Sequence, residues 1–140
     1  MPAEDRRLTI ARDVGELRRM SEWIARRCDS LGVSTTVREN LDVCANEAVA
    51  NVIFHAADAL RDREIALVLD RDGSDVMLEI TDDGAPFDPL STDSRATATS
   101  LDDAPVGGLG LPLIRGLLPR SRYARIGARN VLTLVSAVEG

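Results

Sequence analysis

Apolar residues recur every three to four positions in two long stretches of the chain, and this spacing predicts two amphipathic helices. The first helix is expected from residue 13 or 14 to about residue 30, and Gly32 then interrupts the chain. Ser34 is a favourable N-cap for the second helix, which is expected to end near Leu60. The two apolar stripes consist of Leu17, Met20, Ile24 and Cys28 in the first helix, and of Val37, Leu41, Cys44, Ala48 and Val52 in the second.

Shorter stretches alternate between apolar and polar residues, which is typical of β-strands. Asp72 and Gly73 predict a tight hairpin between the second and third strands. A third helix is expected from Gly108 to Leu118, because Pro119 cannot continue it. This order predicts an α+β fold, a two-layer sandwich with helices on one face of a mixed, mostly antiparallel sheet. The expected strands are 7–12, 64–70, 75–81, 123–126 and 130–137.

Composition narrows the class of protein. The 140 residues suit a single domain, 1–140, with one sizeable core. A net charge of −6 disfavours direct binding of nucleic acid. No apolar stretch approaches the roughly 20 residues that span a membrane, and the N-terminus lacks a signal-peptide pattern. We therefore expect a cytoplasmic protein without a membrane partner, in which Cys28 and Cys44 are buried, reduced thiols.

Glu47 and Asn51 are one helical turn apart, so their side chains project from the same face of the second helix. An amide oxygen is a neutral, hard ligand for Mg²⁺. A carboxylate beside it can orient a hydroxyl group or take its proton. On spacing alone, two polar residues on a solvated helix face are the more common explanation of this pair, and the two later motifs reverse that preference in favour of a site. We predict Glu47 as the catalytic base and Asn51 as the metal ligand.

The segment from Asp82 to Pro89 follows an apolar strand and enters a turn. A carboxylate at this point can accept a hydrogen bond from the 6-amino group of adenine. Gly84 lets the backbone approach the base, because no Cβ atom stands in the way. Asp83 competes with Asp82 for this role, and an ordinary Asp-Gly turn is the simplest alternative. Asp82, Gly84 and Pro86 are the predicted contacts to the base.

The third motif is Gly107-Gly108-Leu109-Gly110-Leu111, at the start of the third predicted helix. Bare amide groups and the positive end of a helix together attract phosphate. Between this motif and the Asp82 turn lies a stretch of small and polar residues, about 84–106, which we predict to be a lid. The chain has no lysine, so Arg95 in the lid or Arg115 on the third helix is expected to offset phosphate charge.

Each motif alone is common, but the three in this order predict a site for ATP and Mg²⁺. The set resembles the GHKL ATPases, the superfamily of gyrase, Hsp90, histidine kinases and MutL. The likeness extends from about Leu8 to Val138. It is strongest to the small anti-sigma-factor serine/threonine kinases, because Pro86-Phe87-Asp88-Pro89 and the stretch Leu109 to Arg115 are typical of them. Asp-x-Gly in that family favours Asp82 over Asp83 as the adenine contact.

The resemblance implies the Bergerat ATP-binding fold and kinase activity toward a serine of a STAS-domain antagonist protein, the anti-anti-sigma partner. It also implies binding to a sigma factor and assembly as a homodimer. Two alternatives remain open. One is a module of the same fold that binds ATP or a partner without transferring phosphate. The other is an ATPase domain taken from a larger machine, which the short chain disfavours.

Overall fold

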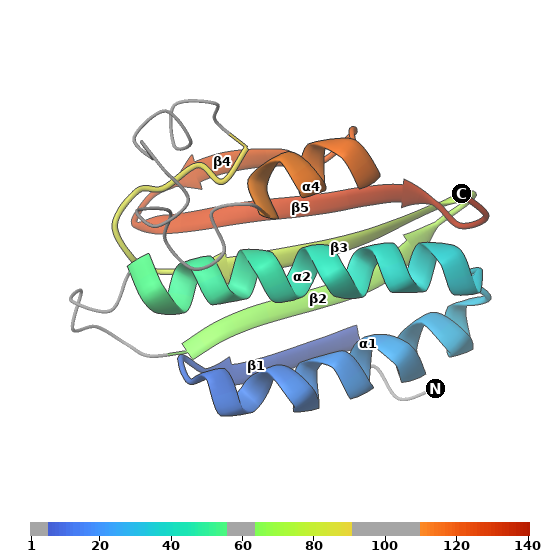
Figure 1. Ribbon diagram of the computed structural model, residues 1–140, viewed down its shortest axis with the longest axis horizontal. Helices are drawn as coiled ribbons and strands as arrows, with labels where there is room; N and C mark the ends of the chain where they lie inside the picture. The colour runs from blue at the N-terminus through green and yellow to red at the C-terminus, as the bar shows by residue number, and fades with distance from the viewer. Residues whose placement is uncertain (1–5, 56–63, 91–109) are drawn as a thin grey trace.

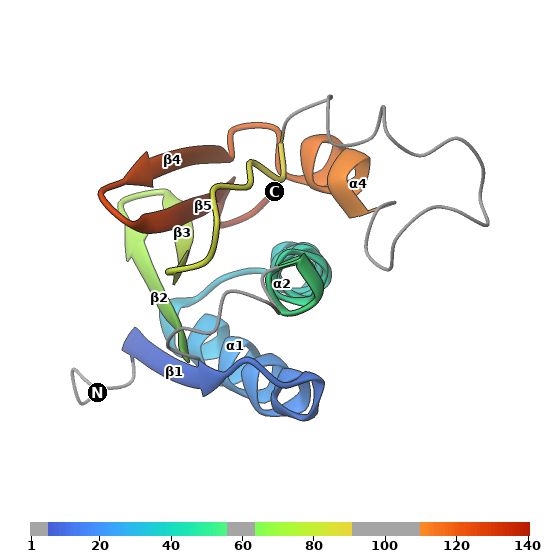
Figure 2. The same ribbon diagram turned by 90° about the vertical axis from the view of Figure 1, so that its left-hand side faces the viewer.

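The computed structural model describes residues 6–55, 64–90 and 110–140. In this part of the chain five strands form one sheet in the order β1-β2-β3-β5-β4, and every pairing is antiparallel. The helices cover one face of the sheet, which Figure 2 shows edge-on. The predicted α+β sandwich is therefore confirmed.

The elements follow the expected order along the chain, as the colours of Figure 1 show. Two predicted helix boundaries lie outside the described residues. They are the end of the second helix, beyond residue 55, and the start of the third helix, before residue 110. The bounds are β1 Arg7–Ala11, a 3-10 turn η2 Val14–Glu16, α1 Leu17–Leu31, α2 Thr35–His55, β2 Glu64–Asp72, β3 Asp75–Asp82, α4 Gly110–Leu117, β4 Arg122–Ile126 and β5 Arg129–Ala137.

The core lies between the sheet and the helices, and α2 occupies its centre, in contact with α1, α4 and β5 (Figure 1). Alternate residues of the central strands point toward α2, because successive side chains of a strand face opposite sides. Trp23 of α1 is 5% exposed and belongs to this core. The strand residues buried here are Ile65, Leu67, Leu69, Val76, Leu78, Ile80, Leu132 and Leu134.

Both apolar stripes of the helices are buried as predicted, apart from their ends. Leu17 and Val52 are only partly buried, and Val52 reaches a cavity described below. Burial raises the pKa of the Cys28 thiol to about 11 and that of the Cys44 thiol to about 12. Both thiols therefore stay protonated at neutral pH and pack as small apolar side chains.

The turn between α1 and α2 sets the angle at which α2 crosses the sheet. Gly32 ends α1 in the left-handed conformation, with φ of 73°, and its N–H donates to the last turn of the helix. Two residues later, the Ser34 hydroxyl accepts a hydrogen bond from the Val37 N–H, which confirms Ser34 as the N-cap of α2.

We expect Gly32→Ala to lower the free energy of unfolding by about 1 to 2 kcal/mol, because a Cβ atom is strained in the left-handed conformation. The new methyl group would also lie 3.2 Å from Nη1 of Arg71. The matched control is Gly116→Ala in α4, where a Cβ atom meets nothing within 4 Å. That variant should be about 0.5 to 1 kcal/mol more stable. Urea denaturation measures both, and equal stability of the two variants would contradict the expectation.

Candidate functional site

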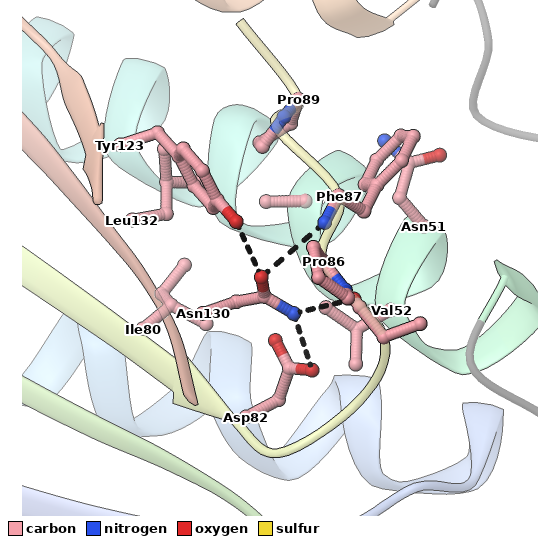
Figure 3. A pocket seen from close by; sticks show the side chains of 12 residues that line it. Asn51, Val52, Ile80, Asp82, Pro86, Phe87, Pro89, Tyr123, Asn130 and Leu132 are labelled. Carbon is pink, nitrogen blue, oxygen red and sulfur yellow. Dashed lines mark hydrogen bonds between the residues drawn. The ribbon is translucent and has the colours of Figure 1, made fainter. Parts of the chain in front are cut away.

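A cavity of about 190 Å³ opens between the C-terminal half of α2 and the sheet (Figure 3). We call it the Asp82 cavity. Its walls are mostly apolar, and the polar side chains that reach it are few, as is usual for a site that holds a small organic molecule. The lining residues are Ala48, Asn51, Val52, Ile80, Asp82, Ala85, Pro86, Phe87, Pro89, Tyr123, Asn130 and Leu132.

Asp82 ends β3 and is 6% exposed. Its Oδ2 atom accepts hydrogen bonds from the Gly84 N–H at 2.8 Å and from Nδ2 of Asn130 at 3.2 Å. Among the described residues no hydrogen bond reaches the other carboxylate oxygen, Oδ1. A buried carboxylate held in this way can accept a hydrogen bond from a ligand in the cavity.

The structure distinguishes Asp82 from Asp83, as the Asp-x-Gly register of the family also did. Asp83 does not line the Asp82 cavity. Its side chain lies instead in a second depression, which it shares with Arg7, Thr9 and Arg129 among others. Asp82 lines both depressions, whereas Asp83 lines only the second, so of the two only Asp82 reaches the cavity beside α2.

Asn51 is the second polar group of the cavity and comes from α2. Its side chain is 1% exposed, and neither Oδ1 nor Nδ2 has a hydrogen-bond partner among the residues described. A buried amide without partners costs about 1 to 3 kcal/mol. Such groups in a native fold call for a partner outside the chain. Asn51 therefore fits a ligand such as a hydrated metal ion or a nucleotide.

Glu47 lies one helical turn before Asn51 and is half-buried. It does not line the Asp82 cavity. Its negative charge adds to the effect of burial in raising the pKa of the Cys44 thiol. The carboxylate thus lies beside the cavity on the helix that forms its wall, in a position that a second molecule can approach from solvent.

The segment after β3 forms the outer wall of the cavity. Gly84, two residues after Asp82, is buried, and Pro86, Phe87 and Pro89 all line the cavity (Figure 3). This is the first part of the predicted lid, and residues 84–90 pack against the cavity rather than extending away from it. The remainder of the predicted lid, 91–106, lies outside the described residues.

The third motif is described only in part. Gly107, Gly108, Leu109 and Arg95 lie outside the described residues, while Gly110 and Leu111 begin α4. Arg115 is exposed on α4, and its guanidinium donates a hydrogen bond to the carbonyl oxygen of Leu90. In this position Arg115 joins α4 to the end of the outer wall.

Sequence motifs missed Asn130, which is 7% exposed at the start of β5. Its amide contacts Asp82, the outer wall and Tyr123 of β4 (Figure 3). One signal was available in the sequence. Asn130 precedes Leu132 and Leu134 at a spacing of two, which puts a polar amide on the buried face of the strand.

The fold and this cavity are those of a domain that can hold a small ligand between a helix layer and the end of a strand. Comparison with known families shows to which family the domain belongs. Residues 10–136 match the model of the histidine kinase-like ATPase domain. The chain belongs to that family and is therefore an ATP-binding domain. The resemblance drawn from the three motifs is confirmed.

One similar protein is the serine/threonine-protein kinase BtrW of Bordetella bronchiseptica (strain ATCC BAA-588 / NCTC 13252 / RB50). It is 40% identical over 103 residues, which cover 74% of this chain and 72% of the relative. Among the helices described, none is long and apolar enough to cross a membrane.

Asp82→Asn should weaken the binding of Mg·ATP by about 10- to 100-fold. The Gly84 N–H and Asn130 both donate to Oδ2, so the carbonyl of the new amide must take that place. Its NH₂ group then replaces Oδ1 and meets the amino group of adenine, donor against donor.

The matched control is Asp83→Asn, which makes the same chemical change on the next residue and outside the cavity. Calorimetry should find its affinity for Mg·ATP close to that of the parent protein. If both variants bind equally well, Asp82 is not the contact to the base.

Proposed function

We propose that the chain is an ATP-dependent serine/threonine protein kinase. It would act as an anti-sigma-factor regulator that phosphorylates a serine of a STAS-domain antagonist protein. The observation that carries the proposal is the pair of polar groups in one apolar cavity, the unpartnered amide of Asn51 and the carboxylate of Asp82. The similarity to a protein named as a serine/threonine-protein kinase supports the same activity.

In this proposal the two groups bind different parts of ATP. Asp82 accepts a hydrogen bond from adenine, and the apolar side chains of Val52, Ile80 and Leu132 pack around the base. Asn51 holds Mg²⁺ through Oδ1, with waters and phosphate oxygens as the further ligands that this ion prefers. When bound, Mg²⁺ neutralises phosphate charge. Across the described ranges no three His, Cys, Asp or Glu side chains gather to offer a competing metal site.

Glu47 is the proposed catalytic base. It shares a helix face with Asn51, so a serine hydroxyl beside it lies close to the phosphates of bound ATP. The hydroxyl oxygen forms a bond to the γ-phosphorus while the bond to the bridging oxygen of ADP breaks, and Glu47 takes the hydroxyl proton. Because Glu47 is only half-buried, a protein substrate can reach it from solvent.

The proposed partners come from the family resemblance and from the regulatory class it implies. They are the STAS-domain anti-anti-sigma protein as substrate, a sigma factor as the regulated protein, and a second copy of the chain in a homodimer. The alternative is a module of the same fold that binds ATP or a partner without transferring phosphate. Glu47 favours the kinase, because a module that only binds ATP does not need a base.

Incubation of the purified chain with γ-labelled ATP and a STAS-domain protein tests the proposal. We expect label on one serine of the substrate and none on the variant of the substrate that lacks this serine. Binding of Mg·ATP without any transfer would instead identify the binding module.

The roles of the two helix residues can be separated by mutation. Glu47→Ala should leave the affinity for Mg·ATP within about threefold and lower phosphoryl transfer by about 10²-fold or more. Asn51→Ala should weaken the binding of Mg·ATP itself, because it removes the metal ligand. Glu39→Ala is the matched control, since Glu39 is an exposed carboxylate elsewhere on α2. Full transfer activity in Glu47→Ala would exclude the proposed base.

Transfer of a phosphoryl group also requires positive charge near its oxygens. The chain has no lysine, so we propose Arg95 first and Arg115 second. Arg95→Ala should lower the rate of transfer more than the affinity for ATP, because the charge acts mostly in the transition state. Single-turnover kinetics and calorimetry measure the two quantities. Unchanged rates in both Arg95→Ala and Arg115→Ala would leave the substrate protein as the source of any further cation.

A further inference from the structure

The side-chain amide of Asn130 makes hydrogen bonds to five different residues. Its Nδ2 donates to Oδ2 of Asp82 at 3.2 Å and to the Ala85 carbonyl at 2.9 Å. Its Oδ1 accepts from the Tyr123 hydroxyl at 2.5 Å, from Nη1 of Arg125 at 3.2 Å and from the Phe87 N–H at 3.3 Å. Figure 3 shows the contacts with Asp82, Tyr123 and Phe87 converging on one amide.

These partners fix which way the amide faces. Every group at Oδ1 is a donor, and both groups at Nδ2 are acceptors. A flipped amide would put oxygen against the carboxylate of Asp82 and the carbonyl of Ala85, and NH₂ against the guanidinium of Arg125 and the N–H of Phe87. Asn130 must therefore present a donor to Asp82.

The contact with Asn130 decides which oxygen of Asp82 remains for a ligand. Asp82 and Asn130 are directly opposite each other in the pairing of β3 with β5. With the Gly84 N–H and Asn130 both on Oδ2, the carboxylate cannot turn without losing two hydrogen bonds. Oδ1 is then the oxygen held ready for an amino group of the base.

The same amide holds the outer wall. It binds the carbonyl of Ala85 and the N–H of Phe87, while Arg125 binds the carbonyl of Gly84. The backbone from Gly84 to Phe87 is thus attached to β4 and β5 at successive peptide groups. The distance between this wall and α2, which sets the width of the cavity, depends on that attachment.

We infer that Asn130 is a positioning residue for recognition of the base: it acts through Asp82, by holding that carboxylate with one oxygen free for the 6-amino group. The inference rests on the proposed contact between Asp82 and adenine. If Asn130 only supported the outer wall, its loss would give a different result. The affinity for every nucleotide that enters the cavity would then fall to the same degree.

The test compares Mg·ATP with the triphosphate of purine riboside, which lacks only the 6-amino group. Calorimetry on the full chain measures both dissociation constants. Asn130→Ala should weaken the binding of ATP by about 10- to 100-fold. It should weaken the binding of the purine analogue by much less, so that the preference for ATP is lost. In the double variant Asp82→Asn/Asn130→Ala, the second change should add little to the first, because both remove the same interaction.

Asn130→Leu is the second variant, because it keeps the branched shape and approximate volume of the side chain and adds no charge beside Asp82. It removes the donor that faces Asp82 and Ala85. The preference for ATP should again be lost, even if Asn130→Ala does not fold. The matched control is Asn46→Ala, which removes a half-buried, hydrogen-bonded asparagine on α2 outside the cavity and should keep the preference.

The outcomes separate the inference from the proposed function. If both nucleotides weaken equally in the two Asn130 variants, or if the preference for ATP persists in them, Asn130 does not position Asp82 and the inference is overturned. The contact of Asp82 with adenine would still stand if Asp82→Asn alone abolished the preference. If the parent protein binds both triphosphates equally, the contact to the 6-amino group is wrong, and the inference fails with it.

Discussion

The buried pair of Asp82 and Asn130 is the interaction on which the rest of the site depends. An isolated carboxylate with 6% exposure would be strongly disfavoured by its loss of hydration. Here two donors satisfy one oxygen, and the cavity leaves the other to a ligand. Because the two residues are partners across neighbouring strands, the pairing that builds the sheet also positions the carboxylate that we propose as the acceptor for the base.

The opposite wall follows from the packing of α2. The apolar stripe of this helix faces the sheet as far as Ala48, and the stripe continues at Val52 into the cavity. Asn51 lies between them in sequence and is carried into the cavity by the same helical rotation. The core therefore fixes the position of the unpartnered amide relative to Asp82. A change in the crossing of α2, such as one at Gly32, would move one polar group of the site away from the other.

The sequence predicted those features that depend on neighbours along the chain. The stripe of α1, the N-cap at Ser34 and the hairpin at Gly73 each follow from residues within one or two turns of one another, so they were confirmed. The role of Asn130 could not be predicted in this way. It depends on the register of β5 against β3, and its partner Asp82 lies 48 residues away. The choice of Asp82 over Asp83 came from the Asp-x-Gly register of the family, and the structure adds that only Asp82 of the two lines the cavity beside α2.

Binding and catalysis make different demands on this chain. In the proposed site Asp82, Asn51 and the apolar walls would serve the binding of ATP, and a module without kinase activity would need all of them. Only Glu47 and a cation near the γ-phosphate distinguish a kinase, because their interactions grow as the phosphoryl group moves. Glu47 does not line the cavity that holds the proposed base contact, and its side chain is half-buried. The group that would act on the second substrate is thus separate from those that bind the first, as expected for an enzyme whose second substrate is itself a folded protein.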